Sequence, residues 1–231
     1  MLIGHVAVAL GAKKAAPKTS FGTLLLAAQL PDLIWPVFLI LGWEHVQIAP
    51  GITAVNPLEF VSYPFTHSLL ADFGWAFVLA GLYLVFAKNR RGALVIWACV
   101  MSHWLLDYIS HGPDLPLYPG SQLVGLGVWD SISMTLIIEG GIFIIGTMIY
   151  SRTTRPRDKI GEYSYKTFIA LLVLIYLASL AGPPPPSVDA VEWAGVFCWI
   201  FLAWAYWIDD HRATVLPPLP PPPTPFVERV D

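Results

Sequence analysis

Residues 129–150 read WDSISMTLIIEGGIFIIGTMIY, an apolar run long enough for a helix to cross a lipid bilayer. Other parts of the chain repeat this pattern. In all, the predicted spans are roughly 20–43, 64–87, 92–111, 129–150, 166–182 and 189–208. The sequence therefore predicts an all-α protein, a polytopic membrane bundle of six transmembrane helices.

The composition favours the same class. The 231 residues are 56% hydrophobic and only 13% charged, which is more apolar surface than one soluble core of this length hides. The formal net charge of −3 has the wrong sign for a nucleic-acid-binding protein, so that class is excluded. The predicted partner of the apolar surface is the lipid bilayer.

Two segments lie outside the predicted spans. The apolar residues 2–11 are about half as long as a span, so they are predicted to form a re-entrant half-helix or an interfacial helix. Residues 1–212 then form a single transmembrane domain. Residues 213–231 contain LPPLPPPPTPF, which favours an extended polyproline II tail that is either solvated or bound by a partner domain.

The basic residues predict the orientation. Lys and Arg cluster before the first span, after the second, after the fourth and after the sixth, whereas the loops 44–63, 112–128 and 183–188 contain none. Because positive loops stay in the cytoplasm, both termini are predicted to be cytoplasmic and these three loops external. Glu44 and His45 are accordingly interpreted as solvated loop residues.

Polar side chains occur inside the apolar runs. An ionisable group at bilayer depth is costly and is retained where it faces a cavity, a partner or a metal ion. In the third span, His103 and Asp107 are one helical turn apart and share a face. The full candidate set is His5, Asp32, His67, His103, Asp107 and Glu139.

The helical rise places these residues in the outer half of the bilayer, with His5 just below them at roughly 12 Å. Counted from the nearest basic cluster, Asp32, His103 and Glu139 lie at roughly 18–20 Å depth, Asp107 at about 24 Å and His67 at about 30 Å. Imidazole and carboxylate ligands suit zinc, with manganese or iron as alternatives. We therefore interpret the six residues as metal ligands, with Asp107 also catalytic and Glu139 either a ligand or the general base.

A bound divalent ion activates water and polarises carbonyl or phosphoryl oxygens, so the predicted chemistry is hydrolysis of an ester or phosphoester, with a lipid or amphiphile as the substrate. One alternative is a transporter that relays protons through the same residues. Another is an accessory subunit that docks on a membrane-protein partner through its aromatic-rich last spans. In the hydrolase these spans are scaffold, with Trp193 and Trp207 as interfacial anchors. Asp72 and His111 are interpreted as packing groups.

At these positions the sequence resembles a bacterial inner-membrane family described as metal-dependent hydrolases. That family has an N-terminal His, a Pro-Asp step, a Thr-His-Ser and a Ser-His-(x)3-Asp. The corresponding elements are Gly4-His5, Pro31-Asp32, Thr66-His67-Ser68 and Ser102-His103-Trp104-Leu105-Leu106-Asp107. The resemblance covers about the first 120 residues and implies a multi-pass protein of the bacterial inner (plasma) membrane.

The order of these residues is remotely similar to the zinc-dependent phospholipase C and single-strand nuclease superfamily, whose later His and Glu ligands have only Glu139 as a counterpart. Two positions depart from the inner-membrane family. Ile34 stands where a second Asp is frequent, and Ser62-Tyr63-Pro64 stands where His-Arg-Gly precedes the Thr-His-Ser. The loss of those ligands implies one metal ion instead of two, or a fold without activity.

Overall fold

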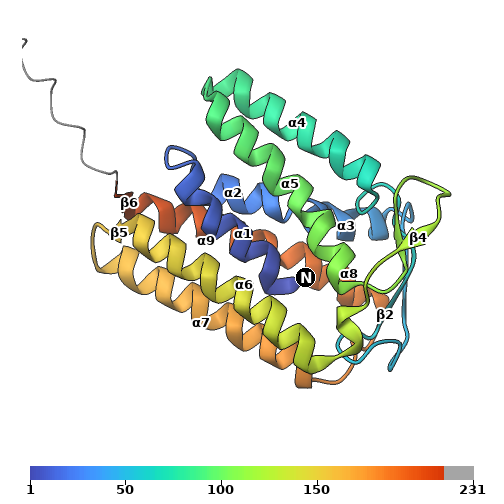
Figure 1. Cartoon of the computed structure of the whole chain (residues 1–231). Coiled ribbons are helices and arrows are strands. Elements are labelled where there is room, and N and C mark those ends of the chain that lie inside the picture. The colour runs from blue at the N-terminus through green and yellow to red at the C-terminus, as the bar shows by residue number, and fades with distance from the viewer. Residues whose placement is uncertain (216–231) are drawn as a thin grey trace, which may run out of the picture.

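The structure is a computed structural model that describes residues 1–215, so the Pro-rich stretch from residue 216 onward lies outside the described residues. Figure 1 shows a bundle of helices joined by short strand pairs. The helices are α1 (Leu2–Ala15), α2 (Phe21–Ala28), α3 (Leu30–Ile40), α4 (Leu69–Ala87), α5 (Arg90–Ser110), the short 3-10 helix η1 (Val128–Asp130), α6 (Ile132–Thr153), α7 (Lys159–Ala181), α8 (Val188–Phe197) and α9 (Trp199–Asp210). The all-α prediction is confirmed.

The strands form antiparallel pairs in the loops. They are β1 (His45–Ile48) with β2 (Leu58–Ser62), β3 (Leu115–Pro116) with β4 (Leu123–Val124), and β5 (Thr154–Pro156) with β6 (Arg212–Thr214). The first two pairs lie together at one end of the bundle, and the third lies at the other end (Figure 1).

The predicted spans correspond to helices in the same order. Among the described residues, five helical segments are long and apolar enough to cross a membrane: α4, α5, α6, α7 and the stretch Val188–Asp210 formed by α8 and α9. The bent pair α2 and α3 makes a sixth if the two helices form one broken span. The helices of the second and fifth predicted spans, α4 and α7, begin at Leu69 and Lys159 rather than at 64 and 166, because the preceding Ser68 and Asp158 side chains cap them.

The first span is broken in its middle. Helices α2 and α3 meet at Gln29 with a bend of 57°. Pro31 stands in the first turn of α3 and has no backbone N–H to donate to the preceding turn, so the helix cannot continue straight. Asp32 follows directly, in that same first turn. The break therefore places the Asp32 carboxylate directly after the bend between α2 and α3.

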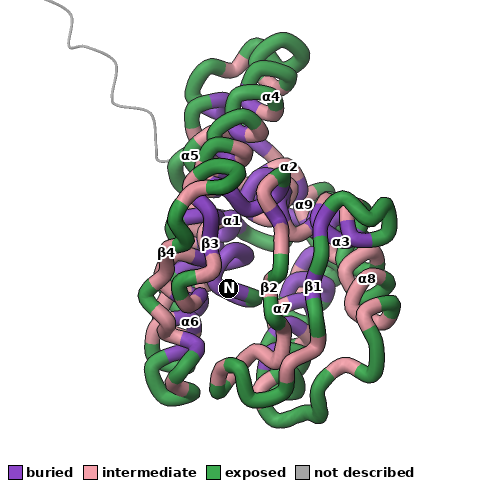
Figure 2. Tube along the Cα trace, turned by 90° about the vertical axis from the view of Figure 1, so that its right-hand side faces the viewer, coloured by how far each residue is buried: buried purple, intermediate pink, exposed green. Residues whose placement is uncertain are grey.

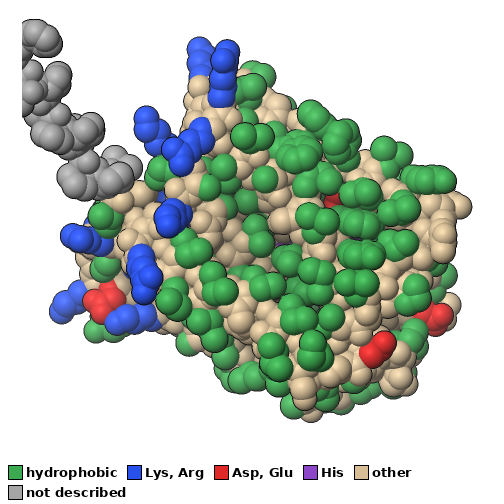
Figure 3. Space-filling model, viewed as in Figure 1, with side chains coloured by type: hydrophobic (Ala, Val, Ile, Leu, Met, Phe, Trp, Pro, Cys, Tyr) green, Lys and Arg blue, Asp and Glu red, His purple; other side chains and the backbone are tan. Residues whose placement is uncertain are grey.

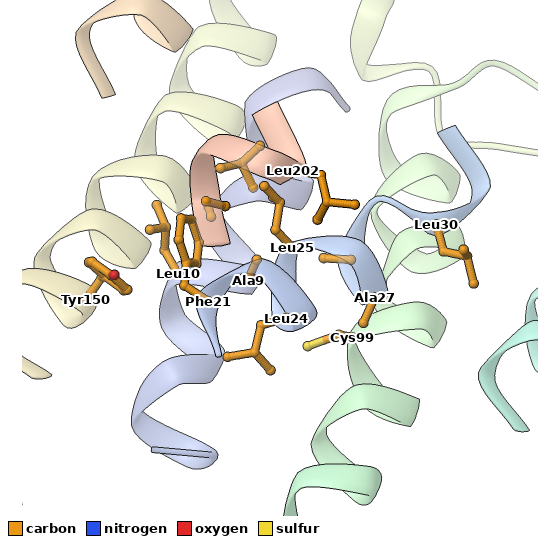
Figure 4. Packing of buried hydrophobic residues seen from close by; sticks show 14 of the residues in the cluster. Ala9, Leu10, Phe21, Leu24, Leu25, Ala27, Leu30, Cys99, Tyr150 and Leu202 are labelled. Atoms are coloured by element: carbon orange, nitrogen blue, oxygen red, sulfur yellow. The ribbon is translucent and has the colours of Figure 1, made fainter. Parts of the chain in front are cut away.

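Helix α1 lies inside the bundle, between α2, α5 and α6 (Figures 1 and 2). Its approach to α6 is so close that a Cβ atom on Gly146 would overlap the backbone carbonyl of Ala7. Leu10 of α1, Phe21 of α2 and Tyr150 of α6 belong to the same buried cluster (Figure 4). Helix α1 is therefore enclosed by other helices of the bundle.

The outer surface is largely apolar (Figure 3). On α4, large side chains such as Phe77, Val85 and Phe86 are exposed, while Asp72, Ala76 and Ala80 are buried. Such a surface is typical of a helix that faces lipid. In the same view, the visible Lys and Arg side chains gather at the end that carries the α4–α5 turn and β5, away from the other strand pairs.

Candidate metal centre

The centre begins with a pair on α5. His103 and Asp107 are one turn apart and both are buried. The Nε2 atom of His103 lies 3.1 Å from Oδ2 of Asp107. Their shared face follows from the sequence spacing, and the structure turns that face toward α1 and α3.

The buried helix α1 adds His5. The Nε2 atom of His5 lies 3.0 Å from Oδ1 of Asp107, so the two oxygens of this carboxylate face two different imidazoles. The amino group of Met1 donates a hydrogen bond to the same Oδ1 at 2.6 Å and lies 2.9 Å from His5 Nε2. His5, His103 and Asp107 form one group whose ligand atoms all lie within 4.8 Å of one another.

A second group adjoins the first. Oδ1 of Asp32 lies 3.4 Å from Nε2 of His67 and 3.7 Å from Nε2 of His103. Asp32, His67 and His103 again place one ligand atom each within 4.8 Å. The Asp32 side chain is 40% exposed, unlike the other members, so the centre is reached from its side. The two groups share His103 and form one site.

The break in the first span orients His103. Its Nδ1 atom lies 2.9 Å from the backbone carbonyl of Ala28, the last residue of α2. A helix end leaves such carbonyls without intrahelical partners. Because a carbonyl only accepts, Nδ1 must carry the proton and donate it, which leaves Nε2 facing the carboxylates of Asp107 and Asp32.

His67 enters the centre from the turn before α4 and not from the helix itself. Simple helical counting puts it at about 30 Å, deeper than the other candidates. The chain from Tyr63 to Ser68 instead folds back, and the ring of Tyr63 packs 5.2 Å from that of His67. Burial, together with the neighbouring Asp114, raises the pKa of Tyr63 well above its ordinary value, so this tyrosine stays a neutral hydrogen-bond donor.

The remaining candidate, Glu139, and two residues interpreted as packing groups, His111 and Asp72, do not join either group. Glu139 is buried in α6, where its Oε1 accepts a hydrogen bond from Trp129 Nε1 at 3.3 Å. Its other oxygen has no hydrogen-bond partner among the described residues. His111 caps the end of α5 and contacts Asp114 at 3.0 Å, while its Nε2 is 4.0 Å from Asp107. Asp72 is buried, and neither of its oxygens has a hydrogen-bond partner within residues 1–215.

Glu44 is a residue that the sequence interpretation missed. The sequence interpretation of Glu44 as a solvated loop residue is wrong, because its side chain folds inward and the residue is only 1% exposed. Its carboxylate contacts Thr66, the neighbour of His67. No periodicity connects positions 44 and 66, so the sequence carries no signal for this contact. His45, the next residue, is exposed as expected.

The donor set fits a divalent cation. His103 Nε2 is buried and has no hydrogen-bond partner in the described part of the chain, although two carboxylates surround it. Three imidazoles and two carboxylates are ligand types that suit zinc, manganese or iron. The outward hydrogen bond from His103 Nδ1 to a backbone carbonyl is the outer contact that metal-ligating histidines usually make.

Comparisons with known proteins agree with a membrane bundle. A family model described as YdjM inner membrane protein matches residues 1–211, which is nearly the whole described chain. No curated protein and no solved structure matches the chain.

Proposed function

The chain belongs to the YdjM inner membrane protein family, and from that premise we propose that it is a membrane-embedded metal-dependent hydrolase. Its substrate is an ester or phosphoester of a lipid or another amphiphile. The ligands are His5, Asp32, His67, His103 and Asp107, which the fold gathers from α1, α3, α5 and the turn before α4.

One observation carries the proposal. The Ala28 carbonyl holds the proton of His103 on Nδ1, so Nε2 presents a lone pair to the carboxylate oxygens of Asp107 and Asp32. Acceptors that face one another in a buried site repel, and a positive charge between them removes the repulsion. The Met1 amino group meets Oδ1 of Asp107, so the acceptors that a divalent ion would bring together are His103 Nε2, Oδ2 of Asp107 and Oδ1 of Asp32.

The residues of the site have different proposed roles in hydrolysis. When bound, a divalent ion lowers the pKa of a water ligand and polarises a carbonyl or phosphoryl oxygen. Asp107, whose oxygens face His5 and His103, is best suited to hold charge and geometry. Glu139 keeps one carboxylate oxygen without a hydrogen-bond partner among the described residues, as a general base requires.

An apolar groove beside the site supports an amphiphilic substrate. The groove has a volume of about 730 Å³ and is lined by side chains that include Phe38, Trp43, Phe65 and Trp75. Phe65 and Ser68, which also line it, flank the Thr66-His67 pair. An acyl chain in this groove would lie against Phe65 and Ser68, which border the segment that carries His67.

The test is metal content by plasma mass spectrometry on protein purified in detergent without chelators. We expect near-stoichiometric metal in the wild type and its loss in His103→Ala and Asp107→Ala. His45→Ala is the matched control, because His45 is exposed in β1 and should leave the metal in place. A screen of phosphoester and ester lipids then follows on the metal-loaded protein.

The rival is a proton relay in a transporter. A second proton on His103 would satisfy the same geometry, since an imidazolium Nε2–H donates to a carboxylate. Wild-type protein that purifies without metal and takes up none on dialysis against zinc, manganese and iron would overturn the hydrolase and favour this rival. The accessory-subunit alternative predicts that the His103 and Asp107 variants alter the assembly of a complex.

A further inference from the structure

The loop between α3 and β1 sends one carboxylate into the protein interior. Glu44 is 1% exposed, although it stands between an exposed Trp43 and an exposed His45. Burying a charged side chain is costly unless hydrogen bonds replace its water. Its partners therefore indicate what the residue does.

Among the described residues, the three groups that donate hydrogen bonds to Glu44 come from Phe65 and Thr66, directly before His67. Oε1 accepts the backbone N–H groups of Phe65 at 2.8 Å and Thr66 at 2.9 Å. Oε2 accepts the hydroxyl of Thr66 at 2.6 Å. Each oxygen faces a donor, so both oxygens of Glu44 act as acceptors.

The hydroxyl of Thr66 connects Glu44 to His67 by hydrogen bonds. Thr66 Oγ1 lies 2.7 Å from Nδ1 of His67. A hydroxyl has one proton, and a carboxylate only accepts, so that proton points to Glu44. At the second contact Thr66 must accept, and Nδ1 of His67 must therefore carry the donated proton.

In a neutral imidazole this leaves a lone pair on the opposite ring nitrogen. That nitrogen, Nε2, makes a 3.4 Å contact with Oδ1 of Asp32, in which it donates a hydrogen bond only if the ring carries a second proton. We propose that Glu44 is a positioning residue that acts through Thr66 to hold His67 in the tautomer that binds metal. Outer contacts of this kind orient metal-ligating histidines in proteins generally. The inference rests on the proposed metal-dependent function.

Glu44→Gln separates this role from simple packing. The amide oxygen of glutamine can still accept the backbone N–H groups of Phe65 and Thr66, so the turn keeps its anchor. Its NH₂ group then faces Thr66 and donates to the hydroxyl oxygen. The hydroxyl proton turns toward His67, which is driven to the tautomer with the proton on Nε2. The substitution thus reverses the direction of the hydrogen bonds while keeping a polar group at each position.

Two measurements test the inference. Nitrogen-15 NMR of histidine-labelled, metal-free protein, with His67 assigned by comparison with His67→Asn, reports the tautomer directly. We expect the proton on Nδ1 in the wild type and on Nε2 in Glu44→Gln. Zinc affinity by competition with a chromophoric chelator should fall about 10–100-fold in Glu44→Gln, the usual effect of losing an outer partner.

Companion variants keep the test decisive. Thr66→Ser retains the hydroxyl and should behave as the wild type, whereas Thr66→Val should lose zinc affinity with Glu44 intact. Glu59→Gln is the matched control, because Glu59 is exposed on the neighbouring strand β2. An unchanged His67 tautomer in Glu44→Gln overturns the inference. A reversed tautomer in protein that binds no metal leaves the hydrogen-bond chain standing and overturns the metal site instead.

Discussion

The rings of His5 and His103 are stacked, with centroids 3.7 Å apart and planes inclined by 11°. Each ring presents its Nε2 atom to a different oxygen of Asp107, at 3.0 and 3.1 Å. One imidazole comes from the enclosed helix α1 and the other from α5, so the stack exists only because α1 enters the bundle. The packing of α1 is therefore part of the site.

The close contact between α1 and α6 should control stability. Gly146→Ala places a Cβ atom against the backbone carbonyl of Ala7, and neither backbone can move without shifting a helix. We expect a loss of about 1–3 kcal/mol, the usual effect of overpacking, measured as a lower thermal unfolding midpoint in detergent. Gly141→Ala on the same helix meets nothing within 4 Å and should be neutral or stabilising. Equal midpoints for the two variants would contradict the packing.

The helix break at Pro31 should matter more for metal affinity than for thermal stability. Pro31→Ala restores a backbone N–H group, which favours a straighter helix and withdraws the Ala28 carbonyl from His103. Zinc affinity should fall about 10–100-fold, as when a metal ligand loses its outer partner, while thermal stability is kept or increased. Pro36→Ala lies beyond the break and is the control. Unchanged zinc affinity in Pro31→Ala would show that the bend does not position His103.

The groove beside the site should select substrates by chain length. Gly74 lines it on α4 and has open space where a side chain would begin, so Gly74→Leu fills the groove without disturbing neighbours. We expect kcat/KM to fall for long-chain esters or phosphoesters and to stay unchanged for short-chain ones, with metal content intact. Gly81→Leu, also in open space on α4 but outside the groove, is the control. An equal loss for both chain lengths would argue against an acyl-chain groove.

The orientation in the membrane is open to a labelling test. In a Cys198→Ala background, which removes the exposed cysteine, one new cysteine replaces Ala54 in the loop 44–63 and another replaces Lys88 at the α4–α5 turn. Because positive loops stay in the cytoplasm, a membrane-impermeant maleimide should label position 54 in spheroplasts and position 88 only after permeabilisation. The reverse pattern would invert the predicted topology.

Local patterns in the sequence determined the spans and some of the relationships between candidate site residues. The apolar runs specified the spans, because a helix that crosses lipid must be apolar for about 20 residues. The four-residue spacing specified that His103 and Asp107 share a face, and Pro31 specified a weak point beside Asp32. Each of these signals depends on residues within one or two helical turns of one another.

Only the tertiary structure decided which candidates meet. His5 reaches Asp107 because α1 is enclosed, and His67 reaches Asp32 because the chain before α4 folds back. Glu139 is buried nearby but lies outside both ligand groups, and Glu44 is drawn inward to Thr66. These contacts join residues that are far apart in the chain. They follow from how whole helices pack and from where buried polar groups find partners, and no local periodicity encodes either.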